Sequence, residues 1–221
     1  MKHLAIFGAS TLAKLAHYHA TREMHLAVDC FVVDDRYKSG NQFLSLPVLG
    51  WSEFTARHEP GSVLLHVAIG YRSMRARAAA YEAVLCAGHL PINIVSSAAY
   101  VADDVVMGHN NLIMAGAVIE SGVSMMSNNV VWSNVTICHD GKVGSHNFLA
   151  ANVTVGGEVQ IGDGNFLGFS SVVMQGRKIG NQTLIGAQSL VRRDTQDLHQ
   201  YRGTPARTVG PVDSEFGIRV D

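Results

Sequence analysis

The chain has 221 residues, of which 47% are hydrophobic and 16% are charged, so it can bury a sizeable core in one large domain or two small ones. Its formal net charge of -1 gives no sign of a nucleic-acid partner. The sequence has neither a long apolar run nor a signal-peptide core, so we expect a cytoplasmic protein without membrane insertion. The 3 cysteines form no Cys-x-x-Cys pair, which argues against a disulfide framework or a cysteine zinc site.

Strand-like and helix-like segments alternate over the first 94 residues. The expected order is strand 4–8, helix 11–24, strand 26–35, short strand 47–50, a helix opened by Ser52, strand 62–70, helix 72–87 and strand 90–95. This rhythm is typical of βαβ units, and it predicts a small Rossmann-like α/β domain with a parallel sheet over residues 1–94.

From Val95 onward the pattern changes to a strict period of six residues. Every sixth residue is aliphatic or Met without interruption, at Val101, Met107, Ile113, Ile119, Met125, Val131, Ile137, Val143, Leu149, Val155, Ile161, Leu167, Val173, Ile179, Ile185 and Val191. Glycine often follows this position, and small residues, aliphatic residues or Asn often stand two before it. Neither an α-helix nor a twisted sheet has this period.

A chain that turns every six residues forms flat faces of short strands, each with one aliphatic side chain directed into a narrow core. Gly and Asn suit the corners because they adopt backbone conformations that bulky residues resist. Three such faces make a coil of 18 residues, so residues 95–191 supply a little over five coils. We therefore predict a parallel β-helix domain over residues 95–195, followed by a C-terminal tail over 196–221.

This ladder resembles the hexapeptide-repeat acyltransferases. Together with the α/β domain, residues 3–207 resemble the bacterial sugar acetyltransferases typified by the sialic acid O-acetyltransferases and the nucleotide-amino-sugar N-acetyltransferases of glycan biosynthesis. The resemblance implies a left-handed β-helix, acetyl-CoA as co-substrate, no metal, and a homotrimer with sites between adjacent subunits. It also implies a sugar or nucleotide-sugar acceptor held by the α/β domain for O- or N-acetylation.

His139 and Asp140 lie in the middle of the ladder, and acetyl transfer needs a base to remove a proton from the acceptor. His139 follows the inward-facing Ile137 by two residues, so we expect it at the surface of a coil, with a pKa near working pH. Asp140 is expected to hold the ring or tune its charge. The alternative is a surface histidine with local hydrogen bonds, but the pair also matches the catalytic His and following acid of the family.

Gly157 lies one coil beyond His139, so the period predicts that it stacks on the same face. Its N–H is then free to meet the thioester oxygen, because no side chain blocks close approach. The resemblance implies the same role for Gly157. The expected reaction is direct transfer through a tetrahedral intermediate, without a Ser or Cys acyl-enzyme.

The resemblance also implies a coenzyme A site along the later coils and the tail. The segment Gly203–Arg207 is similar to the family's Gly-Asn-Pro-Ala-Lys/Arg ending, and Phe148 stands where the family often has a second histidine. The residues expected to bind the donor are Phe148, Gly157, Gly168, Ala187, Pro205 and Arg207.

The turn at Gly8 follows a strand and opens a helix, where free N–H groups face a phosphate or a sugar. The predicted substrate-binding residues are Gly8, Ser10, Thr11, Asp34, Asp35 and Arg72. Turn capping and surface charge explain Asp34 and Arg72 equally well. Leu12 stands where nucleotide-amino-sugar relatives have a histidine that contacts the substrate.

Two other functions are compatible with this fold. One is a non-catalytic sugar-nucleotide binding or assembly protein. The other is a zinc hydrolyase of the carbonic anhydrase type, which needs a short His-x4-His pair that the ladder lacks. We expect His109 and His146 to be solvated corner residues, and Asn152 and Asn165 to be ordinary corner residues.

Overall fold

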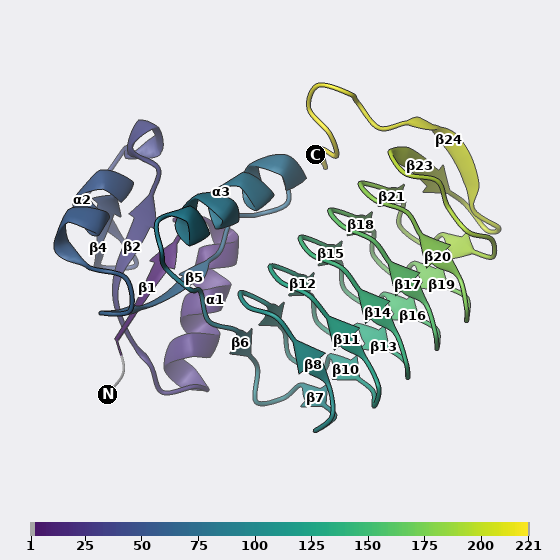
Figure 1. Cartoon of the computed structure of the whole chain (residues 1–221), viewed down its shortest axis with the longest axis horizontal. Coiled ribbons are helices and arrows are strands. Elements are labelled where there is room, and N and C mark those ends of the chain that lie inside the picture. The colour runs from purple at the N-terminus through teal and green to yellow at the C-terminus, as the bar shows by residue number, and fades with distance from the viewer. Residues whose placement is uncertain (1–2, 221) are drawn as a thin grey trace.

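A parallel sheet forms the first part of the chain in the computed structural model, which describes residues 3–220 (Figure 1). β1 (His3–Phe7) pairs in parallel with β2 (Ala27–Val33) and β5 (Leu64–Val67), β2 pairs in parallel with β4 (Leu46–Gly50), and β3 (Gln42–Phe43) adds an antiparallel edge. The strand order is β3-β4-β2-β1-β5. The connecting helices are α1 (Thr11–Arg22), η1 (Asp35–Tyr37), α2 (Trp51–Arg57) and α3 (Met74–Cys86).

Alternating side chains of β1 serve two separate cores, as the two-residue period of a strand requires. Leu4 and Ile6 are buried with residues of α1, whereas Ala5 and Phe7 are buried with residues of α2 and α3. The sheet therefore has a hydrophobic layer on each face, as a parallel sheet usually does. None of the helices within residues 3–220 has the length and apolar character to cross a bilayer.

Several boundaries of the expected elements were wrong. β2 ends at Val33, because Asp34 turns the chain by accepting a hydrogen bond from Arg36 N–H. α3 begins at Met74, because the Ser73 hydroxyl caps it by accepting from Ala76 N–H. The strand expected over 90–95 is reduced to β6 (Ile94–Val95), which pairs with the coil rather than with the front sheet.

Three sheets of two-residue strands enclose the second part of the chain, and their arrangement fits the predicted left-handed β-helix (Figure 1). The first face contains β7 (Tyr100–Val101), β10 (Val118–Ile119), β13 (Thr136–Ile137), β16 (Thr154–Val155), β19 (Val172–Val173) and β22 (Leu190–Val191). The second face contains β8 (Val106–Met107), β11 (Ser124–Met125), β14 (Lys142–Val143), β17 (Gln160–Ile161) and β20 (Lys178–Ile179). The third face contains β6, β9 (Leu112–Ile113), β12 (Val130–Val131), β15 (Phe148–Leu149), β18 (Phe166–Leu167), β21 (Leu184–Ile185), β23 (His199–Arg202) and β24 (Arg207–Pro211).

The predicted ladder residues line the interior of this prism. From Ile113 to Val191 all of them belong to one buried cluster, and Val101 and Met107 pack against its open end. Strands in successive coils pair in parallel at a spacing of 18 residues, as in the bond from Thr136 N–H to Val153 O and the register of Val118 with Thr136. The prediction of one aliphatic side chain per face is confirmed.

Four-residue corners join the faces. We call the corner from the first to the second face the first corner, that from the second to the third the second corner, and that from the third back to the first the third corner. The third residue of a corner commonly has a left-handed backbone, at Asn110, Asn128, Asp140, His146, Asn152 and Glu158 among others. Asn and Gly suit this conformation, as predicted, but Asp, His and Glu also occupy it because the strands on either side fix the turn.

A ladder of asparagines occupies the last position of the second corners. Each buried side-chain oxygen accepts the backbone N–H of the equivalent residue one coil later, at 2.9 Å from Asn129 to Asn111, 2.9 Å from Asn147 to Asn129, 2.8 Å from Asn165 to Asn147 and 2.7 Å from Thr183 to Asn165. Asn165 is thus a corner residue as predicted, and its buried side chain belongs to this ladder.

The α/β part covers the third face of the β-helix. Leu12 and Ala16 of α1 share a buried cluster with the outward side chains of β9, β12, β15 and β18. At the other end, the β23–β24 hairpin caps the last coil, and the chain then returns to α3, where Ile218 O accepts a hydrogen bond from Met74 N–H. The C-terminal tail thus ties the two parts together.

Candidate active site

His139 stands on the first corner of a central coil, with its side chain half exposed. Its Nδ1 lies 2.9 Å from Asp140 Oδ2. Because a carboxylate can only accept, Nδ1 carries the proton and Nε2 is left with a free lone pair. The backbone N–H of His139 donates to Glu120 Oε2 at 2.8 Å, so the corner is held from the preceding coil as well.

Carboxylates surround this imidazole. The hydrogen bond that His139 donates to Asp140 raises the pKa of His139 above its ordinary value, and the negative charges of Asp140, Glu120 and Glu158 raise it further, against an opposing effect of desolvation. These three residues come from three successive coils. The stacking of identical corners is therefore what assembles the acidic environment.

Gly157 lies directly under the ring. A Cβ atom on Gly157 would be 2.5 Å from His139 Nε2, so only glycine fits there without moving the imidazole. The prediction that one coil separates two residues of the same face is confirmed for this pair. A small group brought to Nε2 therefore also lies close to the backbone of Gly157.

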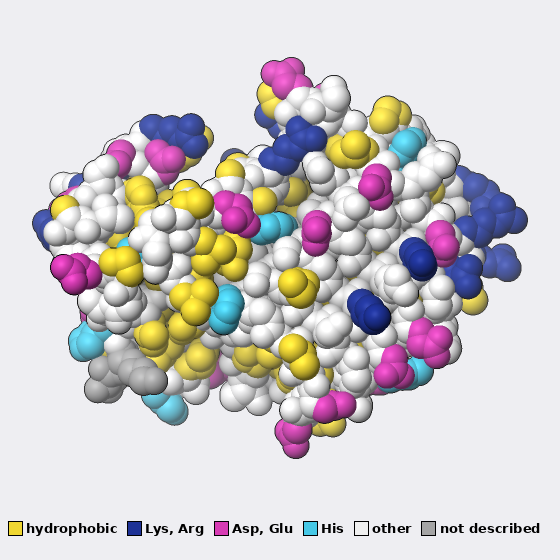
Figure 2. Space-filling view, in the orientation of Figure 1, with side chains coloured by type: hydrophobic (Ala, Val, Ile, Leu, Met, Phe, Trp, Pro, Cys, Tyr) yellow, Lys and Arg dark blue, Asp and Glu magenta, His cyan; other side chains and the backbone are white. Residues whose placement is uncertain are grey.

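Three of the six residues predicted to bind coenzyme A lie along the third corner. Gly168 begins that corner in one coil, and a Cβ atom on it would lie 2.6 Å from the backbone nitrogen of Ala187 in the next. The Thr204 hydroxyl donates to Gln188 O at 3.0 Å, which holds Pro205 beside the same edge. Arg207 is exposed at the start of β24. Lys and Arg side chains gather at the end of the molecule opposite the α/β part (Figure 2).

Phe148 is an exception. Its ring is 1% exposed and packs against Tyr71, Phe166 and Trp132, with centroids 4.8, 5.5 and 5.5 Å away. This packing contradicts the prediction that its side chain contacts coenzyme A, because the ring belongs to the contact between the third face and the α/β part. The six-residue ladder does not reveal which outward face is covered by another element.

The predicted acceptor residues lie at one edge of the front sheet. Gly8, Ser10 and Thr11 follow the carboxyl end of β1, and Arg72 follows the neighbouring β5. β1 has β2 on one side and β5 on the other, so the chain reverses direction across the sheet here, where open α/β sheets bind ligands. Gly8 has a φ of 136° and sits where a Cβ would be 2.5 Å from Ala68 O, so this close approach requires glycine.

The two aspartates have local roles in this structure. Asp34 accepts from Arg36 N–H, and Asp35 accepts from the backbone N–H and hydroxyl of Ser52 at 3.2 and 2.6 Å. Capping thus accounts for both contacts. Each carboxylate nevertheless lies at the carboxyl end of β2, on the same edge as Gly8.

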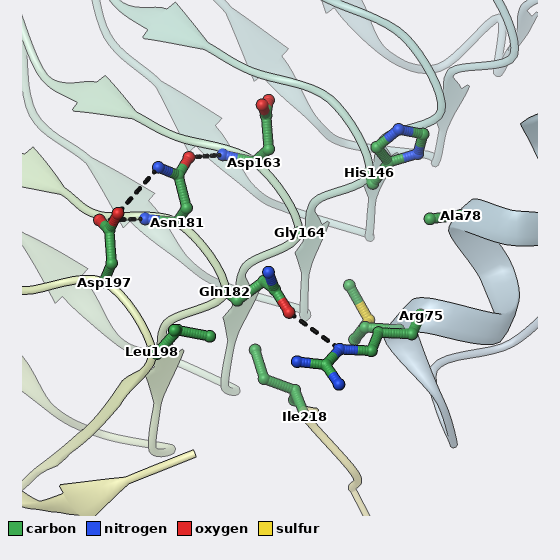
Figure 3. Close-up of a pocket in the computed structure, with 11 residues that line it drawn as sticks. Arg75, Ala78, His146, Asp163, Gly164, Asn181, Gln182, Asp197, Leu198 and Ile218 are labelled. Carbon is green, nitrogen blue, oxygen red and sulfur yellow. Dashed lines mark hydrogen bonds between the residues drawn. The ribbon is translucent and has the colours of Figure 1, made fainter. Parts of the chain in front are cut away.

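His146 was wrongly expected to be a solvated corner residue. Asn128 Nδ2 donates to its Nδ1 at 2.9 Å, its Nε2 lies 3.4 Å from Glu82, and burial lowers its pKa. It lines a cavity of about 560 Å³ between α3, the second corner and the tail, where Arg75 and Gln182 also meet (Figure 3). His109, by contrast, is exposed as expected.

Glu120 was missed in the sequence. Its position is one coil before Cys138, so the 18-residue register alone places it beside the His139 corner. Across residues 3–220, no group of three His, Cys, Asp or Glu side chains is arranged to hold a metal ion.

Comparisons with solved structures show the same architecture over nearly the whole chain. PerB from Caulobacter crescentus, solved with CoA and GDP-perosamine, has a TM-score of 0.76 and 25% identity over 95% of this chain and 98% of its own. The acetyltransferase domain of PglB from Neisseria gonorrhoeae has a TM-score of 0.85 and 21% identity, and WeeI from Acinetobacter baumannii 0.84 and 18%, each over 95% of this chain and 100% of the other. No protein-family model matches the sequence, and a search of curated proteins finds no match.

The six-residue repeat and the two-part architecture give this chain the fold of these acetyltransferase structures. The chain shares with PerB the whole succession of α/β part, β-helix and C-terminal segment, since the alignment leaves only a small part of either chain uncovered.

Proposed function

We propose that this protein is an acetyl-CoA-dependent acetyltransferase acting on a sugar or nucleotide-linked amino sugar of bacterial surface-glycan biosynthesis. The observation that carries the proposal is the His139–Asp140 pair standing on Gly157. It combines a base with a free lone pair, a carboxylate that orients it, and a backbone N–H without a side chain in front of it. PerB, which is 25% identical, was solved with CoA and a nucleotide sugar, in agreement with both proposed substrates.

His139 acts as the general base through Nε2. As the acceptor oxygen or nitrogen attacks the thioester carbonyl carbon, its proton passes to Nε2 and a tetrahedral intermediate forms. The C–S bond then breaks, and the thiolate leaves and takes the proton back from the imidazolium. Asp140 stabilises the imidazolium between the two steps.

The Gly157 N–H is the proposed donor to the oxyanion. One coil earlier, the equivalent N–H is that of His139, and it donates to Glu120. The residue that stands to Gly157 as Glu120 stands to His139 is Cys138, which has no carboxylate. No carboxylate therefore covers the Gly157 N–H from the preceding coil. An uncovered N–H close to the base is what an oxyanion donor requires.

The donor site is proposed to lie between two copies of the chain. On one chain, His139 is on the first corner, whereas Gly168, Ala187 and Pro205 line the third corner, across the first face. The third face, opposite the first corner, is covered by the α/β part. A homotrimer that brings the third corner of one chain against the first corner of its neighbour joins the base to the donor site, with Arg207 toward the coenzyme A phosphates.

The acceptor is assigned to the carboxyl edge of the front sheet, in a Rossmann-like domain over residues 1–94. Gly8 and the open start of α1 suit a phosphate or sugar there, and Arg72 adds a positive charge. The β-helix over 95–195 then supplies the chemistry.

The test is acetyl transfer measured as thiol release from acetyl-CoA over a panel of nucleotide amino sugars and free sugars. We expect transfer with at least one acceptor, and a loss of 100-fold or more, about the usual contribution of a general base, in His139→Ala. His109→Ala changes another exposed corner histidine and serves as the matched control. Equal rates for His139→Ala and wild type would refute the base. Binding of a nucleotide sugar without any thiol release would instead favour a non-catalytic sugar-nucleotide protein.

A further inference from the structure

The Glu120 carboxylate accepts a hydrogen bond from the backbone N–H of His139, for which the strand ladders of the β-helix provide no acceptor. Glu120 begins the first corner one coil before His139, and its half-buried side chain brings Oε2 to 2.8 Å from the His139 nitrogen. Corner N–H groups point away from the strand ladders, so they need other acceptors. For the second residue of a second corner, the acceptor comes from the next coil, as when Ser145 N–H donates to Asp163 at 2.6 Å.

At the first corner the acceptors come from the preceding coil. Asp104 accepts from Gly122 N–H at 3.0 Å and from the Ser121 hydroxyl at 2.7 Å. Glu120 does the same for His139, 19 residues later. The longer side chain matters, because Glu120 starts at the first position of its corner and must reach the second position of the next.

We propose that Glu120 is a positioning residue for His139: by accepting its backbone N–H, it fixes the corner on which the imidazole stands over Gly157. The inference rests on the proposed acetyl transfer and deepens it. Asp140 orients the ring through Nδ1, but it belongs to the same corner and moves with it. Glu120 is anchored in a different coil, so it restrains the corner as a whole.

Charge and position are separable effects of this carboxylate. The charged groups that face His139 are Asp140 on its own corner, Glu120 on the coil before and Glu158 on the coil after. Glu120 also contributes, after burial, to the raised pKa of the neighbouring Cys138 thiol, which agrees with a carboxylate held against this backbone. Removing only the negative charge should move the acid limb of the pH profile to lower pH. Removing the hydrogen-bond acceptor should lower the maximal rate.

Three variants of Glu120 distinguish the two effects. Glu120→Gln keeps an acceptor oxygen at the same reach, so we expect it to retain the plateau kcat within about twofold while the acid limb of the pH profile moves to lower pH. Glu120→Asp keeps the charge but is one methylene too short, and Glu120→Ala removes both. For these two we expect the plateau kcat to fall about tenfold with KM unchanged, because the base is displaced from the acceptor.

Asp104→Ala provides the matched control, since it removes the same kind of corner bond one coil farther from His139. Its kcat is expected to equal that of wild type. A plateau kcat within twofold of wild type in Glu120→Ala would overturn the proposal, and so would a fall in Asp104→Ala or Glu120→Gln as large as in Glu120→Ala.

Amide hydrogen exchange at His139 gives a readout that does not depend on activity. We expect slow exchange in wild type and Glu120→Gln, and faster exchange in Glu120→Asp and Glu120→Ala. Absence of acetyl transfer by the wild type would count against the proposed function alone. Unchanged exchange in Glu120→Ala would count against the role of Glu120 alone.

Discussion

The imidazole of His139 is a stronger base than a free histidine because carboxylates surround it. Its raised pKa has the Asp140 hydrogen bond as its largest cause. Protonation of the folded protein is therefore favoured at this site, so the bond contributes stability below the ordinary histidine pKa, and that contribution is lost as pH rises through the raised value. The neutral imidazole, which is the form needed for catalysis, becomes populated over the same increase in pH.

The pH dependence of the reaction follows from the upward direction of this pKa shift. We predict that kcat/KM increases with pH through a single acid limb whose midpoint lies above 6.5, the ordinary pKa of histidine. Asp140→Asn removes the largest cause of the shift, so the midpoint should move to lower pH, and the plateau should fall about tenfold because the ring loses its orientation. The profile of both proteins checks this, and an Asp140→Asn midpoint at or above that of wild type would contradict it.

A second residue-scale prediction concerns Gly157. Gly157→Ala places a methyl group where a Cβ would be 2.5 Å from His139 Nε2, so the ring must move. We expect kcat to fall about 100-fold, the usual order for a base displaced by about 1 Å, with little change in melting temperature. Gly176→Ala is the control, because it changes a glycine on the same corner of the next coil, with a left-handed φ but no neighbour within 4 Å of its Cβ.

At the scale of elements, the second corner joins the α/β part to the β-helix. The side chain of Asn110 continues the edge of β5: its oxygen accepts from Val67 N–H at 2.7 Å, and its nitrogen donates to Val67 O at 3.1 Å. Arg77 of α3, also buried, donates to the backbone oxygens of Asn128 and His146. A corner side chain thus pairs with the backbone of the front domain, and a front-domain side chain pairs with the backbone of the corners.

Asn110→Ala tests this junction. It leaves the buried Val67 N–H without its acceptor, so we expect a loss of about 2–3 kcal/mol in the free energy of unfolding. Asn134→Ala is the control, because Asn134 has nearly the same left-handed φ, 58° against 59°, but is exposed. We expect it to cost about 1 kcal/mol from the backbone conformation alone. Urea denaturation of the three proteins measures both values, and equal losses would contradict a role for Asn110 at the junction.

The elements differ in how far the sequence predicts them. The strands of the β-helix follow from the period of six, because each coil repeats the same local requirement for an inward aliphatic residue. The ends of β2 and α3 do not follow from hydrophobicity, since Asp34 and Ser73 set them through side-chain hydrogen bonds. Phe148 was misjudged because outward positions look alike in sequence, whether solvent or another element lies beyond them.

At the scale of the molecule, the proposed base and the proposed donor site lie on different corners of the β-helix. The His139 corner and the Gly168–Ala187 edge lie on either side of the first face, and the α/β part that carries the acceptor edge covers the third face. The proposed homotrimer is needed to join them. Activity should therefore depend on assembly, and a dissociated chain should be inactive although folded.

Mixing two inactive variants tests this arrangement. His139→Ala loses the base, and Ala187→Trp, at an exposed position, obstructs the third corner. If each site takes its first corner from one chain and its third corner from a neighbour, random mixing of equal amounts restores about a quarter of the sites, because one chain supplies an intact first corner and its neighbour an intact third corner. Co-expression followed by the thiol assay measures the recovery. No recovery above the separate variants would mean that each site is built within one chain.

The β-helix, its 18-residue coil and the stacking of Gly157 under His139 could be predicted from the sequence, because all three follow from a local period that every coil repeats. The packing of the coils and of the front domain sets which face the α/β part covers, buries Phe148, partly buries His146 and brings Glu120 to the His139 backbone. Those contacts either join residues whose separation in the sequence is not set by the six-residue repeat, or depend on the length and rotamer of a side chain. Such information appears only once the coils are stacked and the front domain is packed against them.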